Sequence, residues 1–226
     1  HHFDLESAED TPSSNGRQPA LDEGILAAQQ ILHGITREEL NYVLIPMGRN
    51  GKEPVGSMGD DTPLSALMDA PRPLYTYFKQ RFAQVTNPPI DSIRERIVMS
   101  LDTHIGRRQS ILEESAEAAR LVHLRSPYLS DEELTRLCEL ELEGYSATTI
   151  AARFAAANGP DGLRTGLDEL SQAAEDAVDA GYSVIVISDR DTNGEFAPIP
   201  MLLAVSTVHH HLIRAGKRMR ASLIAE

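Results

Sequence analysis

Hydrophobic positions in the last third of the chain alternate between helical spacing and short uninterrupted runs. Residues 162–180 carry apolar side chains at helical spacing, and Gly181 follows where a helix typically ends. Residues 182–188 form an unbroken β-branched run, typical of a strand covered on both faces. The same reasoning predicts a second helix at 200–215 and two further strands at 147–154 and 219–224. Helices alternating with strands in this order predict a parallel sheet with residues 182–188 at its centre.

The N-terminal half has shorter and less regular hydrophobic patterns. A helix is expected over residues 21–33, and Thr36 with Glu39 has the capping-box spacing that begins another helix. Ser130 with Glu133 predicts a further capped helix, running to about Glu143. Apolar spacing adds expected helices at 73–85 and 91–99 and a short strand at 121–124.

These elements predict an α/β fold: a mostly parallel β-sheet flanked by helices, with a helical and irregular N-terminal half. His1 and His2 look like the remnant of a purification tag, and residues 1–20 are polar enough to be expected as disordered. Residues 21–226 are then expected to form the folded domain, with a helical and irregular part at 21–120 and an α/β part at 121–226.

Composition narrows the function classes. A net charge of −13 opposes binding to nucleic acid or to an anionic membrane, since both need a basic surface. No apolar run approaches the roughly 20 residues of a membrane-spanning helix, so the cytoplasm is the expected compartment. The one cysteine, Cys138, excludes an internal disulfide, an iron–sulfur cluster and a Cys-type zinc site. Its helical spacing from Leu134 predicts a buried apolar thiol rather than a nucleophile.

Asp189, Arg190 and Asp191 directly follow the expected central strand, where α/β proteins commonly place ligands. The pattern of Asp189 and Asp191 resembles the nucleophile motif of haloacid-dehalogenase-like phosphohydrolases. A loop at a domain interface, with Asp189 and Arg190 hydrogen-bonded to backbone, is the favoured interpretation because no later acidic pair for Mg²⁺ follows.

Three further motifs invite a chemical interpretation. His209, His210 and His211 are successive in an expected helix, so they point about 100° apart and cannot converge on one metal ion. Residues 56–63 lack both phosphate-loop and dinucleotide spacing, which favours a structural turn. The last motif, at 86–91, is a rigid loop.

That loop contains Thr86 and Asn87 followed by Pro88 and Pro89. The prolines fix the backbone while the hydroxyl and amide groups remain available, which suits a wall or gate as well as a helix–helix joint. Just beyond it, Arg94 is placed to pair with Asp91. From the residues alone, no catalytic group is assigned anywhere in the chain.

Several long and idiosyncratic segments occur in the order expected for one family. They are GITREELNYVLIPM at 34–47, GSMGDDTPL at 56–64, YFKQRFAQVTNPPIDSIRE at 77–95, SPYLSDEEL at 126–134, and VIVISDR at 184–190 followed by residues 197–226. On these segments the chain resembles the central domain of the glutamate synthase large (alpha) subunit. Residues 102–110 depart from the Gly-Pro-Glu-Gly-Asn-like turn that this family often has there.

The resemblance implies a scaffold role. The whole subunit would move ammonia from a glutaminase domain through a tunnel to an FMN-binding synthase domain, making glutamate from glutamine and 2-oxoglutarate. FMN and an iron–sulfur cluster would belong to other parts of the parent oxidoreductase, and none to this fragment, which is expected to be inactive by itself. Implied partners are the glutaminase and FMN domains and a small beta subunit. An independent phosphohydrolase or flavin-binding enzyme, and a free-standing interaction module, stay open as alternatives.

The ammonia-path or interdomain candidates are a set of polar and proline residues from two loops. They are Thr86, Asn87, Pro88, Pro89, Asp91, Arg94, Asp189 and Arg190.

Overall fold

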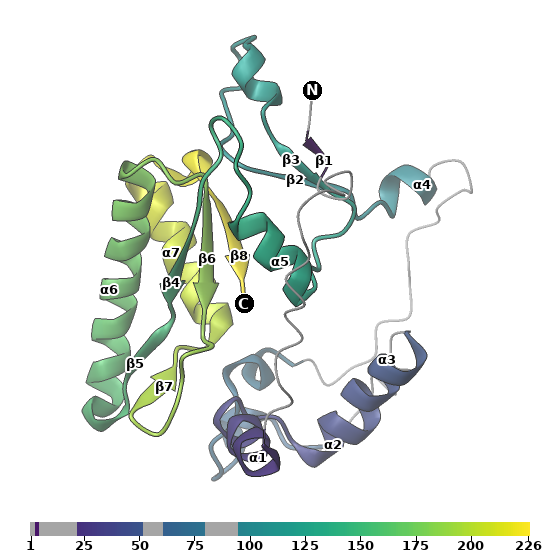
Figure 1. Ribbon diagram of the computed structural model, residues 1–226. Coiled ribbons are helices and arrows are strands. Elements are labelled where there is room, and N and C mark those ends of the chain that lie inside the picture. Colours follow the sequence, from purple (N-terminus) through teal and green to yellow (C-terminus); the bar gives the residue numbers. More distant parts are fainter. Residues whose placement is uncertain (1–2, 5–21, 52–60, 80–94) are drawn as a thin grey trace. The chain divides into compact units, whose positions relative to one another are not determined.

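The computed structural model describes residues 3–4, 22–51, 61–79 and 95–226, drawn as ribbon in Figure 1. The chain forms two compact units. The first, here called the sheet unit, comprises His1–Gln18 with Asp91–Glu226, and the second, the helical unit, comprises Pro19–Ile90. Each unit is described by itself.

The sheet unit is built on three parallel strands in the order β4-β6-β8, so the predicted central strand is confirmed (Figure 1). Two helices connect these strands in chain order and pack against each other. The bounds are β4 (Ala147–Ala151), α6 (Gly159–Asp179), β6 (Val184–Ser188), α7 (Met201–Arg214) and β8 (Ser222–Ala225).

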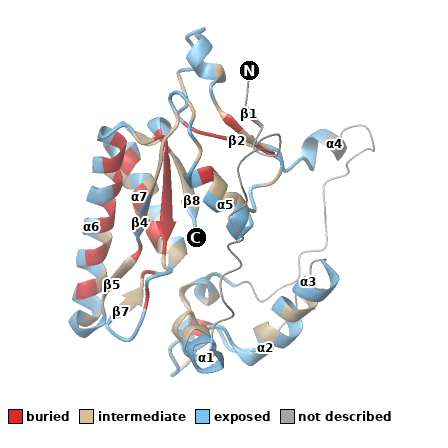
Figure 2. Cartoon of the chain, in the orientation of Figure 1, coloured by how far each residue is buried: buried red, intermediate tan, exposed pale blue. Residues whose placement is uncertain are grey.

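All five residues of β6 are buried, because both faces of the sheet are covered, each by a different core. Ile185 and Ile187 pack into a core shared with α6 and α7. Val184 points the other way, into a second core with Leu137 of α5 (Asp131–Cys138). Burying such side chains contributes about 1.5–3 kcal/mol each. Figure 2 shows the buried colour concentrated on β6 and on the inner side of α6.

The second core also rests on a smaller sheet in the order β1-β3-β2. Its strands are β1 (Phe3–Asp4), β2 (Thr103–Ile105) and β3 (Val122–Leu124), with β1 parallel and β2 antiparallel to β3. The strand predicted at 121–124 is thereby confirmed. Phe3–Asp4 is paired, in contrast to the disorder expected for residues 1–20, whose other members lie outside the described residues.

The remaining elements of the sheet unit are short. Strands β5 (Arg153–Ala155) and β7 (Phe196–Pro198) form an antiparallel pair. Further elements are α4 (Glu95–Val98) and 3₁₀ helices at Ala116–Ala119, Ala156–Asn158 and Arg218–Arg220. Because β2 and α4 belong to this unit, its longer segment begins at Asp91, whereas the α/β part was expected to begin at residue 121.

The helical unit contains α1 (Glu23–Leu32), α2 (Arg37–Glu39), a π-helical turn at Leu40–Leu44 and α3 (Ile45–Asn50). Two 3₁₀ helices follow, at Ser65–Leu67 and Leu74–Phe78. The Thr36 capping box is present as predicted. Pro46, at the start of α3, has no amide hydrogen to continue the α-helical ladder, which accounts for the wide π turn directly before it.

Three expected elements differ from the sequence expectations. The helix expected at 73–85 is a 3₁₀ helix that ends at Phe78, since Lys79 is extended, and residues 80–85 lie outside the described residues. The helix capped by Ser130 ends at Cys138 instead of Glu143. The strand expected at 147–154 divides at Ala152, where the chain leaves one sheet and joins the other. Of the helix expected at 91–99, α4 is present, and residues 91–94 lie outside the described residues.

Cys138 is the fourth correction, because its thiol is exposed and not buried. Leu137 takes the fully buried position on α5, and the next residue along a helix points about 100° away. Partial burial nevertheless raises the pKa of the Cys138 thiol, and the negative charges of Glu226 and Glu139 raise it further. A raised pKa favours the protonated thiol near neutral pH, and the absence of a nucleophilic role stays a prediction.

Candidate functional site

Arg190 joins three elements at the carboxyl end of the parallel sheet. Its Nε donates to Oε1 of Glu226 at 2.6 Å, beyond β8, and its Nη2 donates to Oδ1 of Asp131 at 2.8 Å, at the start of α5. The backbone amide of Asp189 donates to the carbonyl of Glu226 at 3.3 Å. We call Arg190, Asp131 and Glu226 the Arg190 clamp.

The electrostatics of the clamp favour its charged form. Partial burial opposes the charge on the guanidinium, but the carboxylates of Glu226 and Asp131 outweigh it and raise the pKa of Arg190. A loop with Asp189 and Arg190 hydrogen-bonded to backbone was expected; the Asp189 amide does bind backbone, whereas the guanidinium of Arg190 binds two carboxylates. Its role is to fix the end of β8 relative to β6 and α5.

The end of β6 lacks the ligand set that the phosphohydrolase alternative requires. Asp191 is exposed, and its carbonyl accepts a hydrogen bond from Nη1 of Arg153 at 2.6 Å. Among residues 22–51, 61–79 and 95–226, no group of three His, Cys, Asp or Glu side chains is arranged to hold a metal ion. The structure thus adds nothing in favour of a metal-assisted reaction at Asp189 and Asp191.

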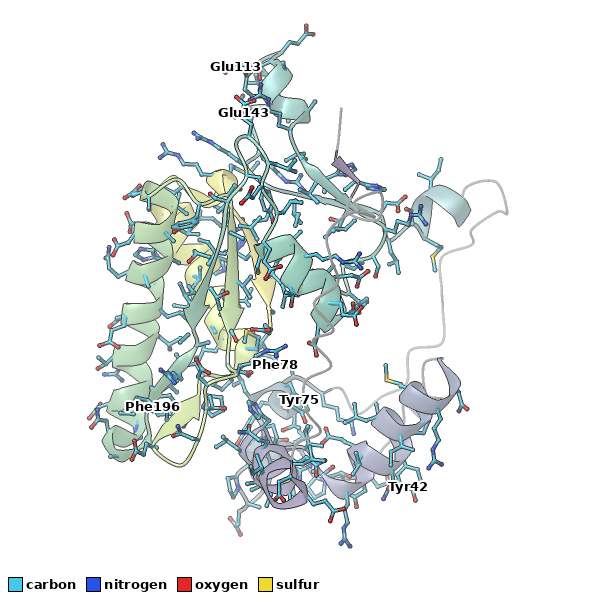
Figure 3. All side chains as sticks on the ribbon, in the orientation of Figure 1. Tyr42, Tyr75, Phe78, Glu113, Glu143 and Phe196 are labelled. Atoms are coloured by element: carbon cyan, nitrogen blue, oxygen red, sulfur yellow. The ribbon has the colours of Figure 1, made fainter. Side chains whose placement is uncertain are left out.

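A cavity of about 350 Å³ lies beside β5, β7 and the first half of α6. Phe196, labelled in Figure 3, forms part of its wall, and the guanidinium of Arg153 stacks 4.6 Å from the centre of that ring. Gly162 and Gly166 line the side formed by α6, where they let the helix approach Phe154 closely. Its lining mixes apolar side chains with the polar side chains of Arg153, Thr165 and Glu169.

A larger cavity, of about 570 Å³, lies within the helical unit. On its wall the hydroxyl of Tyr75 donates to Oε1 of Glu39 at 2.6 Å, and Oγ of Ser65 donates to Oγ1 of Thr76 at 2.9 Å. Burial raises the pKa of Glu39, but hydrogen bonds from Tyr75 and Thr36 outweigh it, so the net shift is downward. Glu39 is therefore a stable acceptor that anchors Tyr75 (Figure 3) rather than a general acid.

The three successive histidines of α7 diverge, as the helical geometry predicts. Nδ1 of His209 accepts from Nε of Arg218 at 2.9 Å, whereas Nε2 of His211 lies 2.6 Å from Oε2 of Glu175. His210 is exposed between them. The rings of His209 and His210 meet edge to face with their centroids 5.2 Å apart, whereas His211 turns to Glu175, and among the described side chains no metal-holding group is formed.

The first three helices of the helical unit, with the π turn between them, contain no buried residue. Ile31 is 80% exposed and Tyr42 is 73% exposed, although both are large apolar side chains. Figure 2 shows these helices almost entirely in the exposed and intermediate colours. Further exposed apolar residues of the same segment are Ile25, Leu26, Val43, Leu44 and Met47. The spacing that predicted these helices did not reveal that their apolar faces are uncovered within this unit.

The site residues predicted from the sequence fall into two groups, one inside and one outside the described part of the chain. Asp189 and Arg190 lie together at the end of β6, with Asp131 and Glu226 as partners that the sequence did not suggest. Thr86, Asn87, Pro88, Pro89, Asp91 and Arg94 lie outside the described residues, as do Gly56 to Asp60.

Comparison with known proteins identifies the family. Residues 28–226 match the model of the glutamate synthase central domain. The chain is 46% identical over 202 residues to ferredoxin-dependent glutamate synthase 2 of Synechocystis sp., which covers 88% of this chain and 13% of that protein. It is 41% identical over 213 residues to the glutamate synthase (NADPH) large chain of Azospirillum brasilense, covering 94% of this chain and 14% of that protein.

The chain belongs to the glutamate synthase central domain family. The resemblance found in the sequence is thereby confirmed, and so is the α/β fold class. The glutamate synthase (NADPH) large chain of Bacillus subtilis is similar to the same extent, at 41% identity over 201 residues. Because the chain spans only 13–14% of the length of these relatives, most of each relative has no counterpart here.

Proposed function

We propose that this chain is the central scaffold domain of a glutamate synthase large subunit, connecting a glutaminase domain to an FMN-binding synthase domain. The parent enzyme makes glutamate from glutamine and 2-oxoglutarate. The central domain helps to form the ammonia path between the glutaminase site and the synthase site. Support comes from the family assignment and from the small share of its relatives that the chain represents.

The uncovered apolar helices carry the scaffold proposal. Helix α1 has ten residues and none of them is buried. Helices of fewer than about 12–15 residues are marginal in water and gain most of their stability from packing. Exposed apolar surface of this kind marks a contact with another folded part. A domain that holds two neighbours at a fixed separation needs such surfaces.

We propose that this chain holds none of the cofactors of the parent enzyme. An iron–sulfur cluster is bound by several cysteine thiolates, and Cys138 is the only cysteine present. FMN and the cluster are accordingly proposed for other parts of the polypeptide, with a small beta subunit as a further partner. Within the described residues no helix is both long and apolar enough to cross a membrane. The cytoplasm remains the predicted compartment.

The ammonia path is proposed to run along the loop at 86–91, with Thr86 and Asn87 facing it and with Pro88 and Pro89 holding its backbone. Ammonia is small and neutral, so its transfer needs a closed, preformed passage more than charged catalysts. Asp91 and Arg94 are proposed to fix the far end of the loop. Asp189 and Arg190 are proposed to lie at the interdomain surface, where the Arg190 clamp would fix the C-terminal end of β8.

The experiment uses the complete large subunit and compares glutamine hydrolysis with 2-oxoglutarate-dependent glutamate formation. The double variant with Thr86→Ala and Asn87→Ala should form less glutamate per glutamine hydrolysed, and free ammonia should make up the difference. Ser206→Ala, on an exposed position of α7, is the matched control and should leave the ratio unchanged. An unchanged ratio in the double variant would reject the path through this loop.

A further inference from the structure

Two arginines lie together on the sheet unit although the whole chain is acidic. Arg218, in the 3₁₀ helix before β8, donates from Nε to Nδ1 of His209 at 2.9 Å and from Nη1 to the carbonyl of Ala221 at 2.7 Å. A guanidinium has five N–H donors in a rigid fork, so donors remain beyond these two contacts. The partly buried side chain is thus held in one orientation by neutral acceptors.

Arg108 follows β2, and hydrogen bonds hold it next to the 3₁₀ helix that contains Arg218. Its backbone amide donates to the carbonyl of Met219 at 2.9 Å, and its Nη2 donates to the carbonyl of His104 at 3.2 Å. The loop is fixed further by Ser222, whose hydroxyl oxygen accepts from the Gly106 amide at 3.0 Å. Both guanidinium groups therefore sit on backbone that is already ordered.

The electrostatics of this pair lack a compensating negative charge. Burial, and then the charge of Arg108, lower the pKa of Arg218, and burial followed by Arg218 lowers the pKa of His209. In the part of the chain that the structure describes, neither Arg218 nor Arg108 forms an ion pair with a carboxylate. The positive charge of Arg108 thus opposes that of Arg218, and an anion that binds both would relieve this repulsion.

The surroundings of the pair are those of a protein interface. Met219 lies between Arg218 and Arg220 in the chain and is 56% exposed, and Arg107 and Arg220 are exposed as well. Arginine and methionine are enriched at protein–protein interfaces, and arginine is frequent among the residues that dominate binding energy. An exposed apolar side chain among cations fits an acidic polypeptide surface better than a small free anion.

We propose that Arg218 and Arg108 form a docking site for a carboxylate carried by an acidic polypeptide segment, with Met219 as its apolar contact. The carboxylate accepts hydrogen bonds from the N–H groups of Arg218 that its contacts with His209 and Ala221 leave unused. Planar bidentate pairing is the geometry that arginine favours with a carboxylate. The choice of a neighbouring domain of the same subunit as partner rests on the proposed function. The carboxylate chemistry rests only on the residues described above.

The test uses the 226-residue chain and a fluorescein-labelled hexaglutamate peptide with blocked ends, followed by fluorescence anisotropy at low salt. Because the net charge of −13 repels acidic peptides, saturable binding reports a local site. Arg218→Gln and Arg108→Gln should each weaken it about tenfold or more. Arg164→Gln, exposed on α6, makes the same change in charge elsewhere and should weaken it little.

Two controls make the outcome decisive. Arg108 is exposed, so Arg108→Gln should leave the melting temperature unchanged, and its binding result stands even if Arg218→Gln disturbs the fold. A hexaglutamine peptide should not bind. Absence of hexaglutamate binding, or equal binding by the wild type and both variants, would overturn the site. Competition by free succinate at the peptide's own concentration would overturn the polypeptide source. Neither result depends on ammonia transfer in the complete subunit.

Discussion

Arg190 donates from its Nε to Oε1 of Glu226 across 2.6 Å, although the two residues are 36 positions apart in the chain. The contact joins the end of the central strand to the end of its neighbour β8. Asp131 receives the second arm of the same guanidinium at 2.8 Å. Three separate elements of the sheet unit are therefore fixed by one side chain.

Removal of the clamp should have a modest effect on stability. The side chain of Arg190 is 40% exposed, so solvent screens its ion pairs, and Arg190→Gln should lower the free energy of unfolding by about 0.5–1 kcal/mol. Urea denaturation at low and high salt checks this. Asp131→Asn should cost less than Glu226→Gln, since the side chain of Asp131 is 68% exposed and that of Glu226 only 18%. The reverse order would contradict the assignment.

Gly166 permits close packing between α6 and β5, and its replacement should be destabilising. A Cβ at this position would lie 2.9 Å from Cβ of Phe154 and 3.4 Å from the carbonyl oxygen of Arg153. After allowance for the better helix propensity of alanine, Gly166→Ala should cost about 1–2 kcal/mol. Thermal unfolding measures this. Gly194→Ala, where a Cβ would meet nothing within 4 Å, is the control and should be close to neutral.

Glu175 gives the sheet unit a pH dependence. Its hydrogen bonds from Lys217 at 2.7 Å and with His211 at 2.6 Å lower its pKa below the ordinary value of 4.5. A lowered folded pKa contributes stability that is present above the unfolded pKa and is lost as the pH falls through the folded pKa. Stability should therefore decline below about pH 4.5.

The variant Glu175→Gln should remove part of that decline. Free energies of unfolding measured from pH 7 to pH 3 should fall less steeply in the variant than in the wild type. Asp168→Asn, at an exposed position of the same helix, should keep the wild-type slope. Identical slopes for the wild type and Glu175→Gln would show that the cluster is not a source of the pH dependence.

Local signals predicted the elements of the sheet unit because those elements depend on neighbours in the chain. The β-branched run of β6, the glycine after α6 and the capping pair of Ser130 with Glu133 each act within a few residues. The partners of Arg190 lie 36 and 59 positions away, and no local pattern indicates them. Leu74, Tyr77 and Phe78 have α-helical spacing, yet the chain forms one 3₁₀ helix there and then extends at Lys79.

The site was predictable only in part for a related reason. The strand end at Asp189 and Arg190 follows from the order of strands and helices, whereas the exposure of a helix face depends on what covers it. The apolar spacing of α1 is the same whether that face meets a core of this chain or another domain. Only the three-dimensional structure shows that none of its residues is buried within the helical unit.

Amide hydrogen–deuterium exchange provides the most direct test of the scaffold account. It compares the 226-residue chain with the complete large subunit. The account predicts that amides of α1 and α3 exchange at least about tenfold more slowly in the complete subunit, because neighbouring domains cover their apolar faces. Amides of β6, buried in both, serve as the internal control. Equal exchange of α1 and α3 in the two proteins would contradict the account.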